Sequence, residues 1–165
     1  QDRRHVAAAH RVLRGVVARR RDRMLVDLER HLVLGGNRIR DHDAARAVCR
    51  VHHAAWHWRD ARLLAWGLMP DRWQGLVTLG ERDSLASLMG RFKALTSRAV
   101  EDRHRVNGWL WGRGFSDRAL APCDDLAAAA HALAQVPVAA GLVARAGDYP
   151  YWNVAAPLAP EPAPD

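Results

Sequence analysis

Cysteine is scarce in this chain of 165 residues, which holds only Cys49 and Cys123. Two cysteines so far apart do not form a disulfide framework, so we expect a reducing, cytoplasmic compartment. No apolar stretch approaches the roughly 20 residues that a membrane helix needs. The apolar segment 6–9 is short and lies among arginines, so we expect no signal peptide. The length predicts one domain whose hydrophobic core is large enough to fold without disulfide bonds or bound metal.

Lysine is almost absent, because Lys93 is the only one among the 25 basic residues. The excess positive charge is concentrated in residues 1–23, where eight arginines face two aspartates, a net of +6 out of +7 for the chain. Arg19, Arg20 and Arg21 form its densest run. Such a basic arm favours a polyanionic partner such as DNA or RNA. A genome composition that favours arginine over lysine explains the same bias without any function.

The other end of the chain has a different composition. Residues 155–165 are rich in alanine and acidic residues and hold four prolines between Pro157 and Pro164. A segment of this kind cannot bury enough apolar surface to pack, so we expect a disordered tail. The sequence therefore predicts three parts: a basic arm at 1–23, a folded domain at 24–154 and a tail at 155–165.

Hydrophobic periodicity predicts alternating strands and helices within the folded part. Strands are expected at 24–28 (with 32–34 continuing or pairing with it), 62–68, 72–79 and 109–120; helices are expected from Asp41 or Asp43 to about Trp58, from Ser84 onward, and from Asp124 or Asp125 to Pro137. This order is typical of an α+β fold, with a ferredoxin-like antiparallel sheet and the helices packed on one face.

Two pairs of positions share a face in this arrangement. The segment Arg62–Gly80 reads as two strands around a tight Met69-Pro70-Asp71 turn. On the second of these strands Arg72 and Gln74 lie on one face, because successive side chains alternate. On the last helix Ala132 and Val136 are four residues apart and share a face as well.

Several motifs follow one another in a distinctive order. After the Met69-Pro70-Asp71 turn come Gly75-Leu76-Val77, Arg91-Phe92-Lys93, the strand Trp111-Gly-Arg-Gly-Phe-Ser-Asp-Arg-Ala-Leu120 and the ending Gly147-Asp-Tyr-Pro-Tyr-Trp152. From about Asp41 to Trp152 the chain thus resembles the REP-associated tyrosine transposases of bacteria, a single-tyrosine family of the HUH endonuclease type. The resemblance implies an HUH-endonuclease-like fold, a single-stranded or hairpin DNA substrate and a metal-dependent nicking activity.

The residues that carry this chemistry in the family are replaced here. The resemblance places two metal-binding histidines at Arg72 and Gln74, the nucleophilic tyrosine at Ala132 and an asparagine at Val136. Arginine has no acceptor and cannot ligate a metal, and alanine cannot attack a phosphodiester. None of the four positions therefore holds the residue that the family uses for metal binding or nucleophilic attack. We therefore expect no catalytic residues, no metal and no cofactor in a transposase-derived protein that still binds DNA.

Basic and aromatic side chains form the expected DNA-binding surface. An arginine at the former metal position could hold a phosphate directly. The strand from Trp109 to Phe115 interleaves aromatic and basic residues, which is typical of stacking on bases, although the tryptophans taken alone favour a core role. The full set is Arg72, Arg91, Lys93, Arg98, Trp111, Arg113 and Arg118, together with Arg19, Arg20 and Arg21 of the arm.

Three alternatives stay open at this level. Cys49, His53 and His57 fall at i, i+4 and i+8 of an expected helix and offer a weak zinc pattern. Tyr149 and Tyr151 are the only tyrosines, so a rearranged nicking site would have to use one of them. The third alternative is that the fold is retained as an interaction module, or as a decaying remnant, without DNA binding. The oligomeric state, monomer or homodimer, is also left open.

Overall fold

The fold is known from a computed structural model, which describes residues 23–29, 42–104, 110–121 and 124–155. Along the chain these form β1 (Arg23–Glu29), α2 (His42–Val51), α3 (Ala55–Trp58), β2 (Arg62–Leu68), β3 (Arg72–Thr78), α4 (Leu85–His104), β4 (Ser116–Ala119), α5 (Leu126–Ala139), the 3₁₀ turn η3 (Ala146–Asp148) and β5 (Trp152–Val154). The five strands make one antiparallel sheet in the order β4-β1-β3-β2-β5. The expected α+β class and antiparallel sheet are confirmed.

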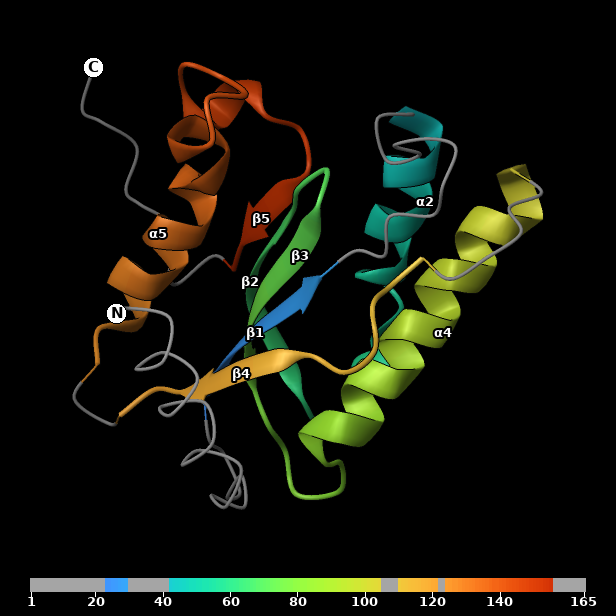
Figure 1. Cartoon of the computed structure of the whole chain (residues 1–165). Helices are drawn as coiled ribbons and strands as arrows, with labels where there is room; N and C mark the ends of the chain where they lie inside the picture. The colour runs from blue at the N-terminus through green and yellow to red at the C-terminus, as the bar shows by residue number, and fades with distance from the viewer. Residues whose placement is uncertain (1–22, 30–41, 105–109, 122–123, 156–165) are drawn as a thin grey trace, which may run out of the picture.

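The helices lie on both faces of this sheet, which corrects the expectation of a single covered face (Figure 1). Helices α2 and α4 pack on one face, over a core that includes Val26, Trp73 and Phe92. Helix α5 packs on the other face, mainly over β2, β5 and β3, in a smaller core around Leu76 and Leu133. The sequence signal for this arrangement is the unbroken apolar run from Leu63 to Leu68 in β2. A strand that is covered on both faces has no polar side.

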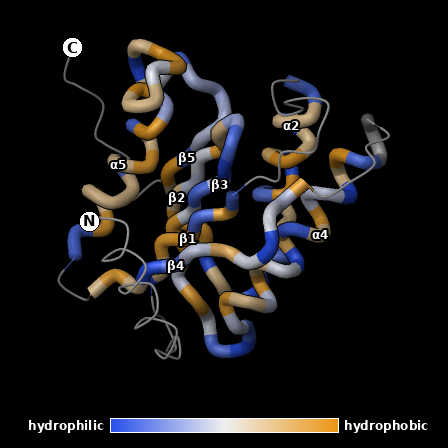
Figure 2. Tube along the Cα trace, viewed as in Figure 1, coloured by the Kyte–Doolittle hydropathy of each residue, from blue (hydrophilic) through white to orange (hydrophobic). Residues whose placement is uncertain are grey.

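Hydrophobic residues run through the middle strands, whereas the loop between β3 and α4 is hydrophilic (Figure 2). Asp60 closes this loop, because its Oδ2 accepts hydrogen bonds from the backbone N–H groups of Glu81 and Arg82 at 2.6 and 2.9 Å. These bonds are the leading reason that the pKa of Asp60 is lowered. No helix of the described residues is long and apolar enough to cross a membrane.

Hydrogen bonds confirm Ser84 and Asp125 as the caps of the last two long helices. Ser84 Oγ accepts from the N–H of Ser87 at 3.1 Å before α4, and Asp125 accepts from the N–H groups of Ala127 and Ala128 before α5. Both caps satisfy backbone donors that have no partner within the first helical turn. Helix α5 runs two residues past the expected end and includes Pro137.

The expected single helix up to Trp58 is wrong, because it is broken between Val51 and Ala55. Backbone N–H groups of residues 52–54 bond three residues back, which tightens the chain and ends α2. His52 turns inward at this break and is 8% exposed. Its Nδ1 lies 3.0 Å from the carbonyl oxygen of Cys49, and its backbone carbonyl accepts from the Trp58 indole at 3.0 Å.

Two other expectations also need correction at the strands. The strand expected at 109–120 is only four residues long, and the structure adds β5, which the sequence pattern did not predict. Strand β5 pairs with β2 through Trp152, Asn153 and Val154. The segment 32–34, nearly all of the basic arm and the tail lie outside the described residues; Arg23, assigned to the arm, begins β1.

An aromatic cluster anchors the centre of the sheet to α4. Trp73 is fully buried and donates from Nε1 to His52 Nε2 at 2.9 Å. The His52 ring stacks on Trp66 with ring centroids 3.8 Å apart, and Phe92 packs against Trp73 with centroids 4.6 Å apart. Gly75 completes the fit, because a Cβ there would lie 2.2 Å from the Trp73 ring.

His52 makes folding stability depend on pH. Burial lowers its pKa from 6.5 to about 3, so the ring is neutral in the folded protein and charges more readily after unfolding. The contribution of His52 to the free energy of unfolding is complete above the pKa of the unfolded chain, 6.5, and is lost as the pH falls through the folded-state pKa of about 3. The free energy of unfolding then changes by up to about 1.4 kcal/mol per pH unit. Urea denaturation at several pH values between roughly 5 and 6.5 measures this slope. His52→Gln keeps an acceptor for Trp73 without titrating, so its profile should be flatter by that amount; parallel profiles would contradict this account.

Candidate nucleic-acid interface

Strand β3 directs two polar side chains to the face that α5 covers. Trp73, Gly75 and Val77 point into the α2–α4 core, so Arg72, Gln74 and Leu76 point the opposite way. Arg72 and Gln74 therefore share a face, as the sequence predicted. Leu76 belongs to the core beneath α5, which fixes this face as the one next to the last helix.

Asp27 on β1 joins these two side chains. It is paired directly with Gln74 across the β1–β3 ladder. Its Oδ2 accepts from Gln74 Nε2 at 3.0 Å and from Arg72 Nη1 at 3.3 Å. Its other oxygen, Oδ1, is buried without a hydrogen-bond partner among the described residues. Sequence reasoning missed Asp27, although a carboxylate between Val26 and Leu28 in an apolar strand was a usable signal.

Arg72 is held by two carboxylates. Besides Asp27, it donates from Nε and Nη2 to Asp71 Oδ2, both at 3.3 Å. Burial lowers the pKa of Arg72, but the charges of Asp27 and Asp71 outweigh it and the net shift is upward. The guanidinium is therefore a permanent cation whose charge is already balanced, and three of its five N–H donors are directed at carboxylates.

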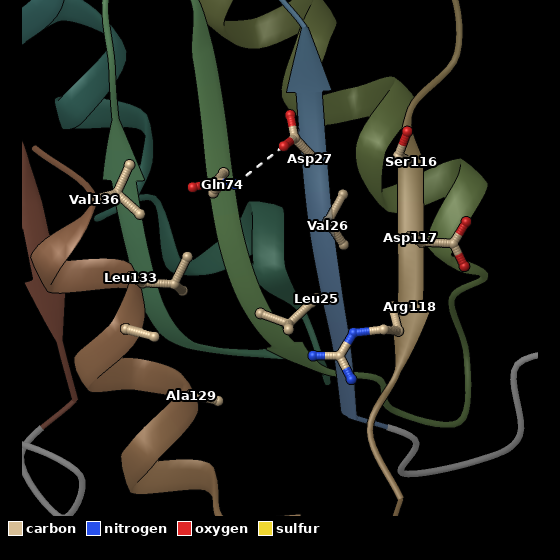
Figure 3. Close-up of a pocket in the computed structure, with 11 residues that line it drawn as sticks. Leu25, Val26, Asp27, Gln74, Ser116, Asp117, Arg118, Ala129, Leu133 and Val136 are labelled. Carbon is tan, nitrogen blue, oxygen red and sulfur yellow. Dashed lines mark hydrogen bonds between the residues drawn. The ribbon is translucent and has the colours of Figure 1, made fainter. Parts of the chain in front are cut away.

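A pocket of about 350 Å³ opens beside this network. Figure 3 shows β1 and β4 on one side of it and α5 on the other. Gln74, Ala132 and Val136 all line it, so one of the two strand positions singled out in the sequence meets both helix positions, whereas Arg72 is not part of the lining. The pocket exists because α5 lies mainly over β2, β5 and β3 and leaves this face of β1 and β4 uncovered.

Arg118 closes the open side of the pocket. It pairs with Leu25 across the β4–β1 ladder, so both side chains lie on the pocket face. Figure 3 shows its guanidinium reaching across β1 toward Leu25, whereas Asp117 points away. Arg118 is exposed and makes no ion pair that the structure records among the described residues.

Comparison with known proteins gives one informative result. No protein-family model matches the chain, and no curated protein matches it either. Among solved structures, the chain is similar to the REP-associated tyrosine transposase bound to a REP hairpin, with a TM-score of 0.61 over 82% of this chain and 78% of that chain. The two proteins share a fold. The sequence identity is 16%, so the similarity extends no further than the fold.

Two of the expected DNA-binding residues on α4 are occupied within the protein. Arg91 forms a bidentate ion pair with Asp83, and its Nη2 also donates to the His57 carbonyl oxygen at 3.2 Å. Lys93 donates to the carbonyl oxygens of Gly112 (2.9 Å) and Gly114, and burial lowers its pKa. Both side chains make bonds within the protein, so a phosphate would have to compete with these partners, and their expected role in DNA binding stays a prediction.

Trp111 is likewise a core residue and not a stacking platform. The residue is 4% exposed, and its indole N–H donates to Thr96 Oγ1 at 2.8 Å. Among the other expected contacts, Arg98 and Arg113 are exposed, on α4 and before β4 respectively. Arg19, Arg20 and Arg21 lie outside the described residues.

The alternative sites find no geometric support. The break after α2 separates Cys49 from His57, and the described residues contain no group of three His, Cys, Asp or Glu side chains placed to hold a metal. His57 is fully buried, with a pKa lowered to about 4 chiefly by burial. Tyr149 donates its hydroxyl to the Leu68 carbonyl oxygen at 2.6 Å, and burial raises its pKa to about 12.

Lys93 and Arg98 give a matched test of structural against binding roles, because both are on α4. Lys93→Met removes charge-assisted hydrogen bonds to two carbonyls and should lower the free energy of unfolding by about 1–2 kcal/mol. Arg98→Met should change it by no more than about 0.5 kcal/mol, since Arg98 is exposed. Urea denaturation measures both. Equal stability of the two variants would show that Lys93 does not hold the 112–114 segment.

Proposed function

We propose that this protein is a transposase-derived DNA-binding protein that recognises single-stranded or hairpin DNA and has lost nicking and strand transfer. The observation that carries the proposal is the meeting of Gln74, Ala132 and Val136 in one pocket. These are the positions where the resembling family holds its catalytic groups. The shared fold with a transposase bound to a REP hairpin supports the DNA ligand.

The residues present do not fit a catalytic divalent metal. A hard cation needs several oxygen ligands. Of the two carboxylates that hold Arg72, only Asp27 lines the pocket, and its Oδ2 already accepts two N–H donors. The adjacent Arg72 guanidinium repels a cation. Gln74 turns its N–H₂ toward Asp27, which leaves one neutral carbonyl oxygen. We therefore derive no cleavage step through a metal in this pocket.

DNA contact in this proposal rests on the arginines that remain exposed. Arg72 is balanced by Asp27 and Asp71, so it offers a phosphate little net positive charge. Arg98, Arg113 and Arg118 are exposed cations suited to phosphate contacts. The arginine arm adds the larger share of the net positive charge.

A rearranged nicking site is less compatible with the side chains. A tyrosine nucleophile is activated by a lowered pKa or by a neighbouring base. The pKa of Tyr149 is instead raised to about 12, and its proton is directed at a carbonyl oxygen. Tyr151 does have a neighbouring base, because its hydroxyl contacts His42 Nδ1, but neither residue lines the pocket.

Catalytic silence is the first expected outcome. Incubation of the protein with a hairpin oligonucleotide and Mg²⁺ or Mn²⁺ should yield neither cleaved DNA nor a covalent adduct, because the described residues that line the pocket include no tyrosine and no set of metal ligands. Denaturing gels with end-labelled DNA measure both products. A labelled adduct that survives denaturation would overturn the proposal, and Tyr149→Phe and Tyr151→Phe would then identify the attacking residue.

The second expected outcome is that DNA binding is electrostatic and depends mainly on the basic arm. Each phosphate contact releases counterions, so the logarithm of the affinity should fall with the logarithm of salt by about 0.7 per contact on single strands. Deletion of residues 1–22 should flatten this slope and weaken binding to all sequences alike. Fluorescence anisotropy across a salt series measures the slope. An unchanged slope would assign binding to the folded part, whereas absent or salt-insensitive binding would favour the interaction-module alternative.

A further inference from the structure

We propose that Arg23, Thr78 and Arg62 form a site for a phosphate dianion, such as the terminal phosphate of a nucleic-acid strand. The three residues lie at the ends of their strands, and none of them lines the pocket beside α5. The inference goes beyond the proposed function, because it names a ligand group that also occurs outside DNA.

The three residues form one row across three neighbouring strands. Arg23 is the first residue of β1, Arg62 is the first of β2, and Thr78 is the last of β3. The backbone register pairs Thr78 with Arg23 on one side and with Arg62 on the other. Adjacent strands lie about 4.8 Å apart, so the backbones of the two arginines are roughly 10 Å apart with the threonine between them.

The side chains of this row share the face of the sheet on which α5 lies. Met24 and Val77 are buried in the core under α2 and α4, and Leu63 packs against that core. Because side chains alternate along a strand, the three residues of the row point to the opposite face. Paired residues on one face of antiparallel strands are direct side-chain neighbours, so both arginines can reach a group held above Thr78.

The row is open to solvent and carries two charges that no carboxylate of the described residues balances. Arg62 is exposed and Arg23 is half-buried. The ion pairs recorded within the described ranges belong to other arginines, namely Arg72, Arg91 and Arg145. Two permanent like charges on one face repel each other, whereas an anion seated between them is attracted by both.

The acidic side chains of the neighbouring segments are directed at the backbone. Asp60, two residues before Arg62, accepts two N–H groups of the loop after β3. Asp124, in the segment after β4, accepts the N–H of Ala121, and Asp125 accepts N–H groups at the start of α5. These carboxylates hold a loop, a turn and a helix cap, and none is recorded as bonded to an arginine of the row.

A phosphate dianion matches the row in charge and in shape. Two guanidiniums carry two positive charges, and a terminal phosphate carries about −1.5 to −2 near pH 7, whereas a carboxylate carries one negative charge. A terminal phosphate also has three free oxygens, enough for two guanidinium forks and the Thr78 hydroxyl. Arg118 adds positive potential on the same face, where its guanidinium reaches toward Leu25, two residues from Arg23 (Figure 3).

Three hairpins labelled in the loop test the site. They share one sequence and carry a 5′-terminal phosphate, a 3′-terminal phosphate or hydroxyls at both ends. In anisotropy titrations one phosphorylated hairpin should bind about tenfold tighter than the hydroxyl hairpin, which corresponds to one charge-assisted hydrogen bond. Arg23→Ala and Arg62→Ala should each abolish this preference, and Thr78→Val, which removes the hydroxyl and keeps both charges, should reduce it.

Arg46→Ala is the matched control. Arg46 is exposed on α2, which packs on the opposite face of the sheet (Figure 1). The change removes the same charge as Arg23→Ala and Arg62→Ala but should keep the preference for the phosphorylated end. Urea denaturation of each variant checks that it is folded.

Inorganic phosphate tests the site without DNA. Replacement of chloride by phosphate at equal ionic strength should raise the urea midpoint of the unmodified protein and of Arg46→Ala more than that of Arg23→Ala and Arg62→Ala, because a ligand stabilises only the state that binds it. The general stabilising effect of phosphate on proteins acts on all variants alike and cancels in this comparison.

The outcomes separate the site from the proposed function. A preference for one phosphorylated end that both arginine variants lose assigns the ligand to a DNA terminus. Equal binding of the three hairpins, with stabilisation by inorganic phosphate that depends on the two arginines, supports the site and assigns it to a free phosphate. Equal binding with equal stabilisation of all variants overturns the site, as does a preference that survives both arginine changes. Failure to bind any hairpin overturns the proposed function, and the inorganic-phosphate comparison then decides the site.

Discussion

The structure depends on the anchoring of Trp73 in the core between the sheet and α4. Its buried indole donates to His52, and a bare Gly75 leaves room for its ring. Because side chains alternate along a strand, this one anchored ring directs Arg72 and Gln74 to the opposite face. A shift of β3 by one residue would bury those polar groups in the aromatic cluster and expose Trp73, which sets a large energetic penalty against any other register.

On that opposite face, the partial cover by α5 decides what the site can do. The helix buries Leu76 and the β2 side of the sheet but leaves β1 and β4 open beside it. The pocket therefore has an apolar wall from α5 and faces polar side chains from β1, β3 and β4. Asp27 adds order to it by fixing both Arg72 and Gln74.

The structure also sorts the basic side chains into two classes with different consequences. Arg72, Arg91 and Lys93 are directed at carboxylates or carbonyl oxygens of the protein itself. Their charges are balanced or partly buried, so a phosphate would have to compete with these internal partners. Arg98, Arg113 and Arg118 remain exposed and can neutralise phosphates at little cost. The residue type alone did not distinguish these classes.

The sequence by itself determined the features that depend on neighbours along the chain. Local periodicity determines the β2–β3 hairpin around Pro70 and the shared face of Arg72 and Gln74. Short-range hydrogen bonds determine the caps at Ser84 and Asp125.

Tertiary structure decided what depends on residues far apart in the chain. Four features are of this kind: the inward turn of His52, the burial of Trp111, the pairing of Asp27 with Gln74 and the placement of α5 on the second face. The hydrogen-bond partners that fix the first three lie from 15 to over 40 positions away in the sequence. Such contacts form only when the sheet brings separate strands together. No local pattern specifies them, because the same residues could equally have been solvated on an open surface.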